Sequence, residues 1–115
     1  MTTNLSKPEI LAPTFCQTMA DVRAGVDDVD RALVALLARR FGYMDAAARI
    51  KDNRDAVRDE ARKFQVIENV RAEAKAIGLP ENVLAQLWDG LVEGSIAYEL
   101  GRWDEIRAAK QIASD

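Results

Sequence analysis

Histidine is absent from the chain, and cysteine occurs only once, at Cys16. A chain without histidine cannot build a His-based catalytic triad, and a transition-metal site is disfavoured because histidine and cysteine are its usual ligands. A single cysteine excludes an intrachain disulfide. If the chain is an enzyme, its chemistry must therefore depend on arginine, lysine and carboxyl groups.

Long apolar runs and a strong net charge are also missing. No run approaches about 18 residues, the length that favours a membrane span. The N-terminus lacks the basic and apolar regions of a signal peptide. A formal net charge of −3 gives little electrostatic support to binding of nucleic acid or a membrane surface. We therefore expect a cytoplasmic protein with no nucleic-acid or membrane partner.

The chain has 115 residues, of which 49% are hydrophobic and 30% charged, as is typical of one soluble domain. Strand signals are absent, and the spacing of apolar residues predicts an all-α fold with three helices. The first should run from Met19 to about Asp52, and the second should begin near Arg58 or Asp59. Gly78 should follow the second helix as its C′ residue, and Pro80 should occupy the N1 position of the third.

The helical segments define one domain, residues 19–108, between an N-terminal tail or short arm (1–18) and a C-terminal tail (109–115). The second and third helices should have apolar faces that include Phe64, Ile77, Val83, Leu87, Val92 and Ile96. The first helix would be about 50 Å long at 1.5 Å per residue. One chain cannot cover its apolar stripe, so we expect an entwined homodimer.

Two cations interrupt the apolar stripe of the first helix. The stripe consists of residues spaced mainly by three or four: Val22, Val26, Val29, Leu33, Leu36, Met44 and Ala47. Arg40 stands where the next apolar residue should be, and Lys51 follows Ala47 by four. A buried cation costs several kcal/mol unless an anion meets it, and no acidic residue does so on this part of the stripe. The pattern predicts a pocket for a small dianion.

The basic candidates also have simpler interpretations. Arg40 could extend to solvent or pair with an acid on another helix, and Lys51 could interact with the helix dipole. Arg23 points away from Arg40 on the helix, so it could serve the pocket of a partner subunit or be a solvated arginine. Arg62 and Lys63 look like part of a solvated face.

The polar candidates likewise allow two interpretations. Asp59 could be the N-cap of the second helix. Ser95 and Glu99 are four residues apart and share a face of the third helix beside the apolar one. A glutamate in that position is more often at the rim of a site than part of its chemistry.

Several short motifs resemble the all-helical chorismate mutase family over about residues 19–104. They are Ala20-Asp21-Val22-Arg23, Val29-Asp30, Leu36 to Arg40, Ala46 to Lys51, Arg58-Asp59 with Arg62, and Glu93 with Ser95-Ile96. The order and spacing of Arg23, Arg40 and Lys51 make the resemblance fairly specific. The run Arg39 to Tyr43 also looks like the isochorismate-pyruvate lyase branch of the same fold.

The resemblance implies an entwined homodimer with two equivalent sites, in which chorismate rearranges to prephenate without cofactor or metal. It implies that Arg23 reaches a substrate carboxylate from the partner subunit and that Arg40 binds a carboxylate within its own chain. Lys51 would contact the ether oxygen of the breaking C–O bond.

The remaining roles implied by the resemblance concern the ring of the substrate and the ether oxygen. Asp59 would meet the ring hydroxyl with Arg62 nearby, and Ser95 would hold the ring carboxylate. Glu99 stands where bacterial members often carry a glutamine that donates to the ether oxygen, so Glu99 must be protonated to help. Lys63 occupies a position where many mutases have glutamate.

We therefore expect a chorismate mutase of the shikimate pathway, which serves aromatic amino acid biosynthesis. A pericyclic shift needs a flexible dianion held in its reactive conformer and donors aimed at the oxygen that becomes enolate-like. One alternative is an isochorismate-pyruvate lyase that makes salicylate and pyruvate with the same cations. The other is a non-catalytic helical dimer that binds a small dicarboxylate.

Overall fold

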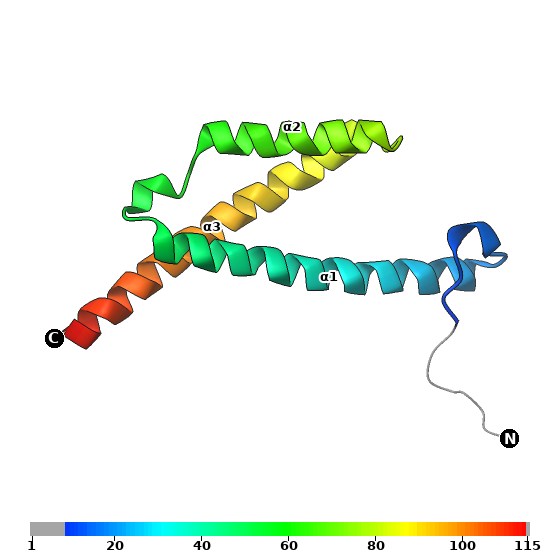
Figure 1. Ribbon diagram of the computed structural model, residues 1–115. Helices are drawn as coiled ribbons and strands as arrows, with labels where there is room; N and C mark the ends of the chain where they lie inside the picture. Colours follow the sequence, from blue (N-terminus) through cyan, green and yellow to red (C-terminus); the bar gives the residue numbers. More distant parts are fainter. Residues whose placement is uncertain (1–8, 115) are drawn as a thin grey trace, which may run out of the picture. The chain divides into compact units, whose positions relative to one another are not determined.

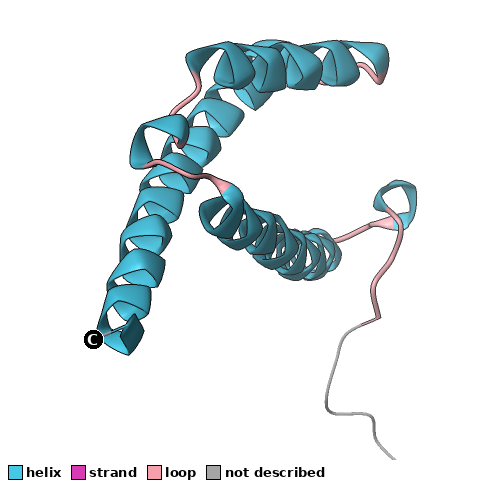
Figure 2. Cartoon of the chain, turned by 60° about the vertical axis from the view of Figure 1, so that its left-hand side comes forward, coloured by secondary structure: helices cyan, strands magenta, loops and turns pink. Residues whose placement is uncertain are grey.

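The computed structural model describes residues 9–114, and this range contains helices but no strand (Figures 1 and 2). The three α-helices are α1 (Met19–Ile50), α2 (Glu60–Ala76) and α3 (Glu81–Ser114). Short 3-10 helices, η1 (Pro13–Phe15) and η2 (Arg54–Ala56), precede α1 and α2. The predicted all-α fold with a long first helix is confirmed. None of these helices has the length and apolar character needed to cross a membrane.

The chain forms two structural units, Met1–Arg40 and Phe41–Asp115, and α1 begins in one and ends in the other. In the first unit, reciprocal capping fixes the start of α1. The Asp21 carboxylate accepts hydrogen bonds from the backbone N–H groups of Gln17 and Thr18, and the Thr18 hydroxyl accepts one from the Asp21 N–H. The bond from Gln17 is the main cause that lowers the pKa of Asp21.

Residues 9–18 belong to the segment predicted to be a tail or a short arm, whose first eight residues lie outside the described range. The carbonyl oxygen of Leu11 lies 4.0 Å from the position that a Cβ atom on Gly25 would occupy. An added Cβ at this point of α1 would therefore make only an ordinary van der Waals contact with the arm. The apolar stripe beyond it is largely exposed in the single chain, with Val29 at 55% and Leu36 at 58%.

In the second unit, α2 and α3 form a helical hairpin (Figure 1). The turn between them is a Schellman motif, in which Leu79 N–H donates to Ala74 O and Gly78 N–H donates to Lys75 O. Gly78 has a φ of 77°, which an L-residue adopts only with strain. The prediction of Gly78 as the C′ residue is confirmed.

Helix ends differ from the predicted ones at three places. The first helix ends at Ile50 rather than Asp52, and α3 begins at Glu81, so Pro80 precedes the helix instead of occupying N1. Pro80 still supplies the carbonyl that accepts the bond from Leu84 N–H. The last helix continues through residues 109–114, the part of the chain in which the sequence predicts a C-terminal tail.

The core of the second unit is small. Its buried cluster joins the segment before α2 to α3 and consists of Val57, Val92 and Ile96, with Val66, Leu100 and Trp103 packed against it. Four residues of the predicted apolar faces are exposed in the single chain: Phe64 (68%), Ile77 (73%), Val83 (59%) and Leu87 (61%). The periodicity identified the helices correctly, but α2 presents Val66 rather than Phe64 to this core.

Candidate functional site

A buried ion pair connects the end of α1 to the middle of α3. Lys51 is the first residue after α1, and its Nζ atom lies 2.7 Å from Oε2 of Glu99. The Glu99 side chain is only 5% exposed, whereas that of Lys51 is 29% exposed. The same Nζ atom lies 3.5 Å from the carbonyl oxygen of Val57. Glu99 is therefore not a rim residue in this chain, and the acid that meets Lys51 comes from another helix.

Ser95 lies one helical turn before Glu99 and is also buried, with 3% of its surface exposed. Its hydroxyl donates to the carbonyl oxygen of Leu91 at 2.7 Å, a bond within the helix. Ser95 and Glu99 thus supply two buried polar groups on one face of α3.

Asp59 and Arg62 lie together at the start of α2. Asp59 is the N-cap, and its Oδ1 accepts a hydrogen bond from the Arg62 backbone N–H at 3.0 Å. The structural interpretation of Asp59 as a helix cap is therefore confirmed, and the cap uses only one of its carboxylate oxygens. The Arg62 guanidinium is exposed and donates to Gln65.

Arg23 and Arg40 lie in the first structural unit, on the part of α1 that precedes Phe41. Arg23 is exposed in the single chain, and Arg40 is half-buried and engaged with neighbouring residues. The structure thus brings Lys51 and Glu99 together directly and places Ser95 beside Glu99. The roles of Arg23 and Arg40 stay predictions.

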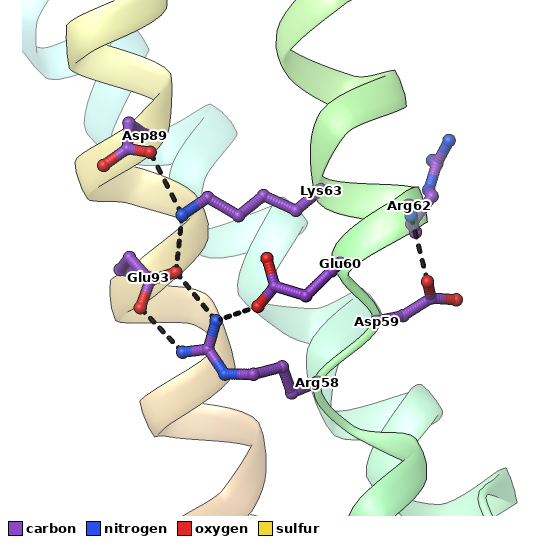
Figure 3. A network of polar contacts seen from close by, with 7 residues as sticks. All are labelled: Arg58, Asp59, Glu60, Arg62, Lys63, Asp89 and Glu93. Carbon is purple, nitrogen blue, oxygen red and sulfur yellow. Dashed lines mark hydrogen bonds and ion pairs between the residues drawn. The ribbon is translucent and has the colours of Figure 1, made fainter.

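An ion-pair cluster that the sequence did not reveal lies at the start of α2, against α3 (Figure 3). It consists of five charged residues: Arg58, Glu60, Lys63, Asp89 and Glu93. Arg58 makes a bidentate pair with Glu93 at 2.7 and 3.1 Å. Lys63 lies 2.8 Å from Glu93 and 3.1 Å from Asp89. The prediction that Lys63 belongs to a solvated face is wrong, because its side chain reaches α3 and is only 19% exposed.

Hydrogen bonds in this cluster shift the pKa values of Glu93, Arg58 and Lys63. The bond from Arg58, followed by that from Lys63, lowers the pKa of Glu93 to about 2. The same contacts raise the pKa values of Arg58 and Lys63. The cluster fixes the start of α2 against α3.

Two hollows lie elsewhere in the described residues. One, of about 440 Å³, lies between the arm and the first turns of α1, is mainly apolar and is also lined by Asp28 and Asp30. These acids would repel a dianion. The other, of about 430 Å³, lies between the end of α1 and α3 and is lined by residues that include Arg49, Arg102 and Asp45. None of the seven predicted site residues lines either hollow.

Comparison with known proteins identifies the family to which this chain belongs. The model of the family described as chorismate mutase type II matches residues 22–100. Over 97 residues the chain is 28% identical to a protein of Pseudomonas aeruginosa named isochorismate pyruvate lyase, and the match covers 84% of this chain and 96% of that protein. The family match includes all seven predicted site residues and starts after the arm.

Proposed function

This chain belongs to the chorismate mutase type II family, and from that premise we propose that it is a chorismate mutase. The reaction is the cofactor-free Claisen rearrangement of chorismate to prephenate, in which a C–O bond breaks and a C–C bond forms without any group leaving. The observation that carries the proposal is the buried contact of 2.7 Å between Lys51 and Glu99. The contact places a cation beside a carboxyl group that can donate a hydrogen bond when it is protonated. In the proposed mechanism the ether oxygen needs both groups.

In the proposed mechanism, Lys51 donates to the ether oxygen as it acquires negative charge. Protonated Glu99 donates to the same oxygen, whereas an ionised Glu99 would repel the dianionic substrate. Arg40 and, from the partner subunit of a homodimer, Arg23 hold the substrate carboxylates and keep the reactive conformer folded.

The ring of the substrate would be held by the remaining candidates. Ser95 would bind the ring carboxylate by turning its buried hydroxyl from the carbonyl oxygen of Leu91 so that it donates to the carboxylate. Asp59 would meet the ring hydroxyl with the carboxylate oxygen that its cap does not use, and Arg62 would lie nearby. On this proposal the protein acts in the cytoplasm, in the shikimate pathway that leads to aromatic amino acids.

Isochorismate-pyruvate lyase is the second candidate function, and the Pseudomonas aeruginosa relative of that name favours it. Isochorismate also carries two carboxylates and an enolpyruvyl ether. Its conversion to salicylate and pyruvate breaks the same C–O bond while a ring hydrogen moves to the side-chain methylene. The same cations would serve both reactions.

Parallel assays distinguish these functions. We expect prephenate from chorismate at a rate that exceeds salicylate formation from isochorismate. The opposite ratio would identify the lyase. Absence of turnover with either substrate from about pH 4 to 8, together with tight chorismate binding, would support the non-catalytic dimer that binds a dicarboxylate.

The proposal predicts the consequence of replacing Lys51. Lys51→Ala should lower kcat/KM by at least about a hundredfold, or about 2.7 kcal/mol of transition-state stabilisation. The variant should also melt at a lower temperature at neutral pH, because Glu99 is then buried without its cation. Steady-state kinetics and thermal melts measure both effects, and near-parental turnover would show that Lys51 is structural.

A further inference from the structure

Two side chains of α3, Trp103 and Arg107, hold the C-terminal end of α1. Trp103 Nε1 donates to the carbonyl oxygen of Lys51 at 3.1 Å. Arg107 donates through Nη1 to the carbonyl oxygen of Ala48 at 2.6 Å and through Nη2 to that of Lys51 at 2.5 Å. The last carbonyls of a helix have no partner within it, and a cation at that end interacts favourably with the helix dipole. The end of α1 is thus capped at Lys51.

The donors of Arg107 are directed at the backbone rather than at a carboxylate. None of the ion pairs among residues 9–114 includes Arg107. Its guanidinium instead lies 4.4 Å from the ring centroid of Trp103, which orients it by a cation–π contact. By contrast, Arg54 and Arg58 use their guanidinium groups in bidentate pairs with acids of α3.

Glu99, Trp103 and Arg107 are spaced by four along α3. Residues at this spacing lie along one face of a helix, offset by about 40° at each step. This face of α3 therefore contacts Lys51 twice. Glu99 holds its ammonium at 2.7 Å, while Trp103 and Arg107 hold its backbone carbonyl.

We propose that Trp103 and Arg107 are positioning residues for the reaction, acting through the backbone of Lys51. This inference rests on the proposed function, in which the Lys51 ammonium must face the ether oxygen. Lys51 lies just outside α1 and is followed by an irregular connection, so its own helix does not fix it fully. A displacement of about 1 Å in a catalytic group can lower a rate by about a hundredfold.

The test compares three variants with one matched control. Arg107→Met removes both donors, and Trp103→Phe removes one donor but keeps an aromatic ring. Each should lower kcat by about tenfold to a hundredfold with a smaller change in KM, and Arg107→Lys should recover part of the loss. The control is Asp104→Asn, which breaks the pair of Arg54 with Asp104 on the same turn of α3 without touching Lys51. Its kcat should stay within about twofold of the parent.

A second comparison separates positioning from a general structural role. In a Lys51→Ala background, Arg107→Met and Trp103→Phe should cause little additional loss, because the group that they position is gone. An equal loss in both backgrounds, or parental kcat in both single variants, would overturn the inference. If Arg107→Met fails to show a helical circular dichroism spectrum, Trp103→Phe decides alone. Full activity of Lys51→Ala would instead reject the proposed function of Lys51.

Discussion

The protonation state of Glu99 determines what this residue can do. An ionised carboxylate only accepts hydrogen bonds, whereas a protonated one can donate. In the described chain the Lys51 ammonium lies 2.7 Å from the Glu99 carboxyl group. A bound dianion would compete for Lys51 and would repel an ionised carboxylate, so the proposed role requires the neutral form of Glu99 in the complex.

Replacing Glu99 by glutamine tests this expectation. The parent should be most active in mildly acidic solution and lose activity as the pH rises toward about 8. Glu99→Gln keeps a donor of similar shape at every pH, so its profile should be flatter and its activity near pH 8 should exceed that of the parent. The measurement is kcat/KM for chorismate from about pH 5 to 8. A flat parental profile with a neutral Glu99→Gln variant would show that another group faces the ether oxygen.

Among the helices, the α2–α3 hairpin has the clearest set of stabilising features: a Schellman turn, a small apolar cluster and the ion pairs around Glu93. These features act at different places along the hairpin. The turn fixes the end of α2, while the ion pairs fix its start against α3 (Figure 3). Their contributions can therefore be measured separately.

The ion pairs of Glu93 predict a loss of stability in acid. The pKa of Glu93 falls from 4.5 to about 2 in the folded chain, so the unfolded chain binds more protons between these values. The stabilisation is present above about pH 4.5 and is lost as the pH falls through about 2. Glu93→Gln should therefore melt below the parent at about pH 7, and the difference should shrink in acid.

Glu73→Gln provides the control, because Glu73 lies exposed on the neighbouring helix α2 and takes part in none of the ion pairs among residues 9–114. Thermal melts followed by circular dichroism should show little change for this variant. A difference between Glu93→Gln and the parent that stays constant down to about pH 2 would contradict the assigned role of Glu93.

Two glycines in the hairpin should respond in opposite ways to alanine. Gly78→Ala should destabilise the chain by about 1–2 kcal/mol, because alanine is strained at a φ of 77°. Gly90→Ala, inside α3 and with no neighbouring atom within 4 Å of the added Cβ, should stabilise by about 0.5–1 kcal/mol. Urea denaturation measures both. Loss of stability in Gly90→Ala would indicate that another molecule approaches this face closely.

At the scale of the whole molecule, the single chain has only a small hydrophobic core. Its buried hydrophobic residues among positions 9–114 include three alanines and only three larger residues, Val57, Val92 and Ile96. The apolar stripe on the first half of α1 is exposed at the same time, with Val26 at 51% and Leu33 at 49%. Burial of apolar surface is the dominant favourable term in folding and association. A second chain that covers this stripe would therefore supply the apolar burial that a single chain lacks.

We therefore predict a homodimer at micromolar concentration, with Arg23 acting across the interface. Sedimentation should give twice the chain mass. Mixing inactive Arg23→Ala and Lys51→Ala chains should restore about one working site per heterodimer, since one site then has both residues. A fully helical monomer would reject this architecture. Absence of recovery after subunit exchange would show that Arg23 does not act from the partner.

The sequence by itself determined the helices and the family. Apolar spacing located all three helices, and Gly78 identified the end of the second, because these signals are local and depend on neighbours within a turn or two. The motifs around Arg40 and Lys51 identified the family to which the chain belongs. The sequence also suggested Asp59 as a cap, since that geometry lies within four residues.

The tertiary structure alone decided how distant side chains pair. Lys51 and Glu99 are 48 residues apart, Arg58 and Glu93 are 35 apart, and Arg107 is 59 from the carbonyl that it caps at Ala48. The position of Lys63 in the sequence is equally compatible with a solvated helix face and with an ion pair to α3. Such pairings depend on how helices cross, which no local pattern records. That is why the partner of Lys51 and the capping role of Arg107 became visible only in the folded chain.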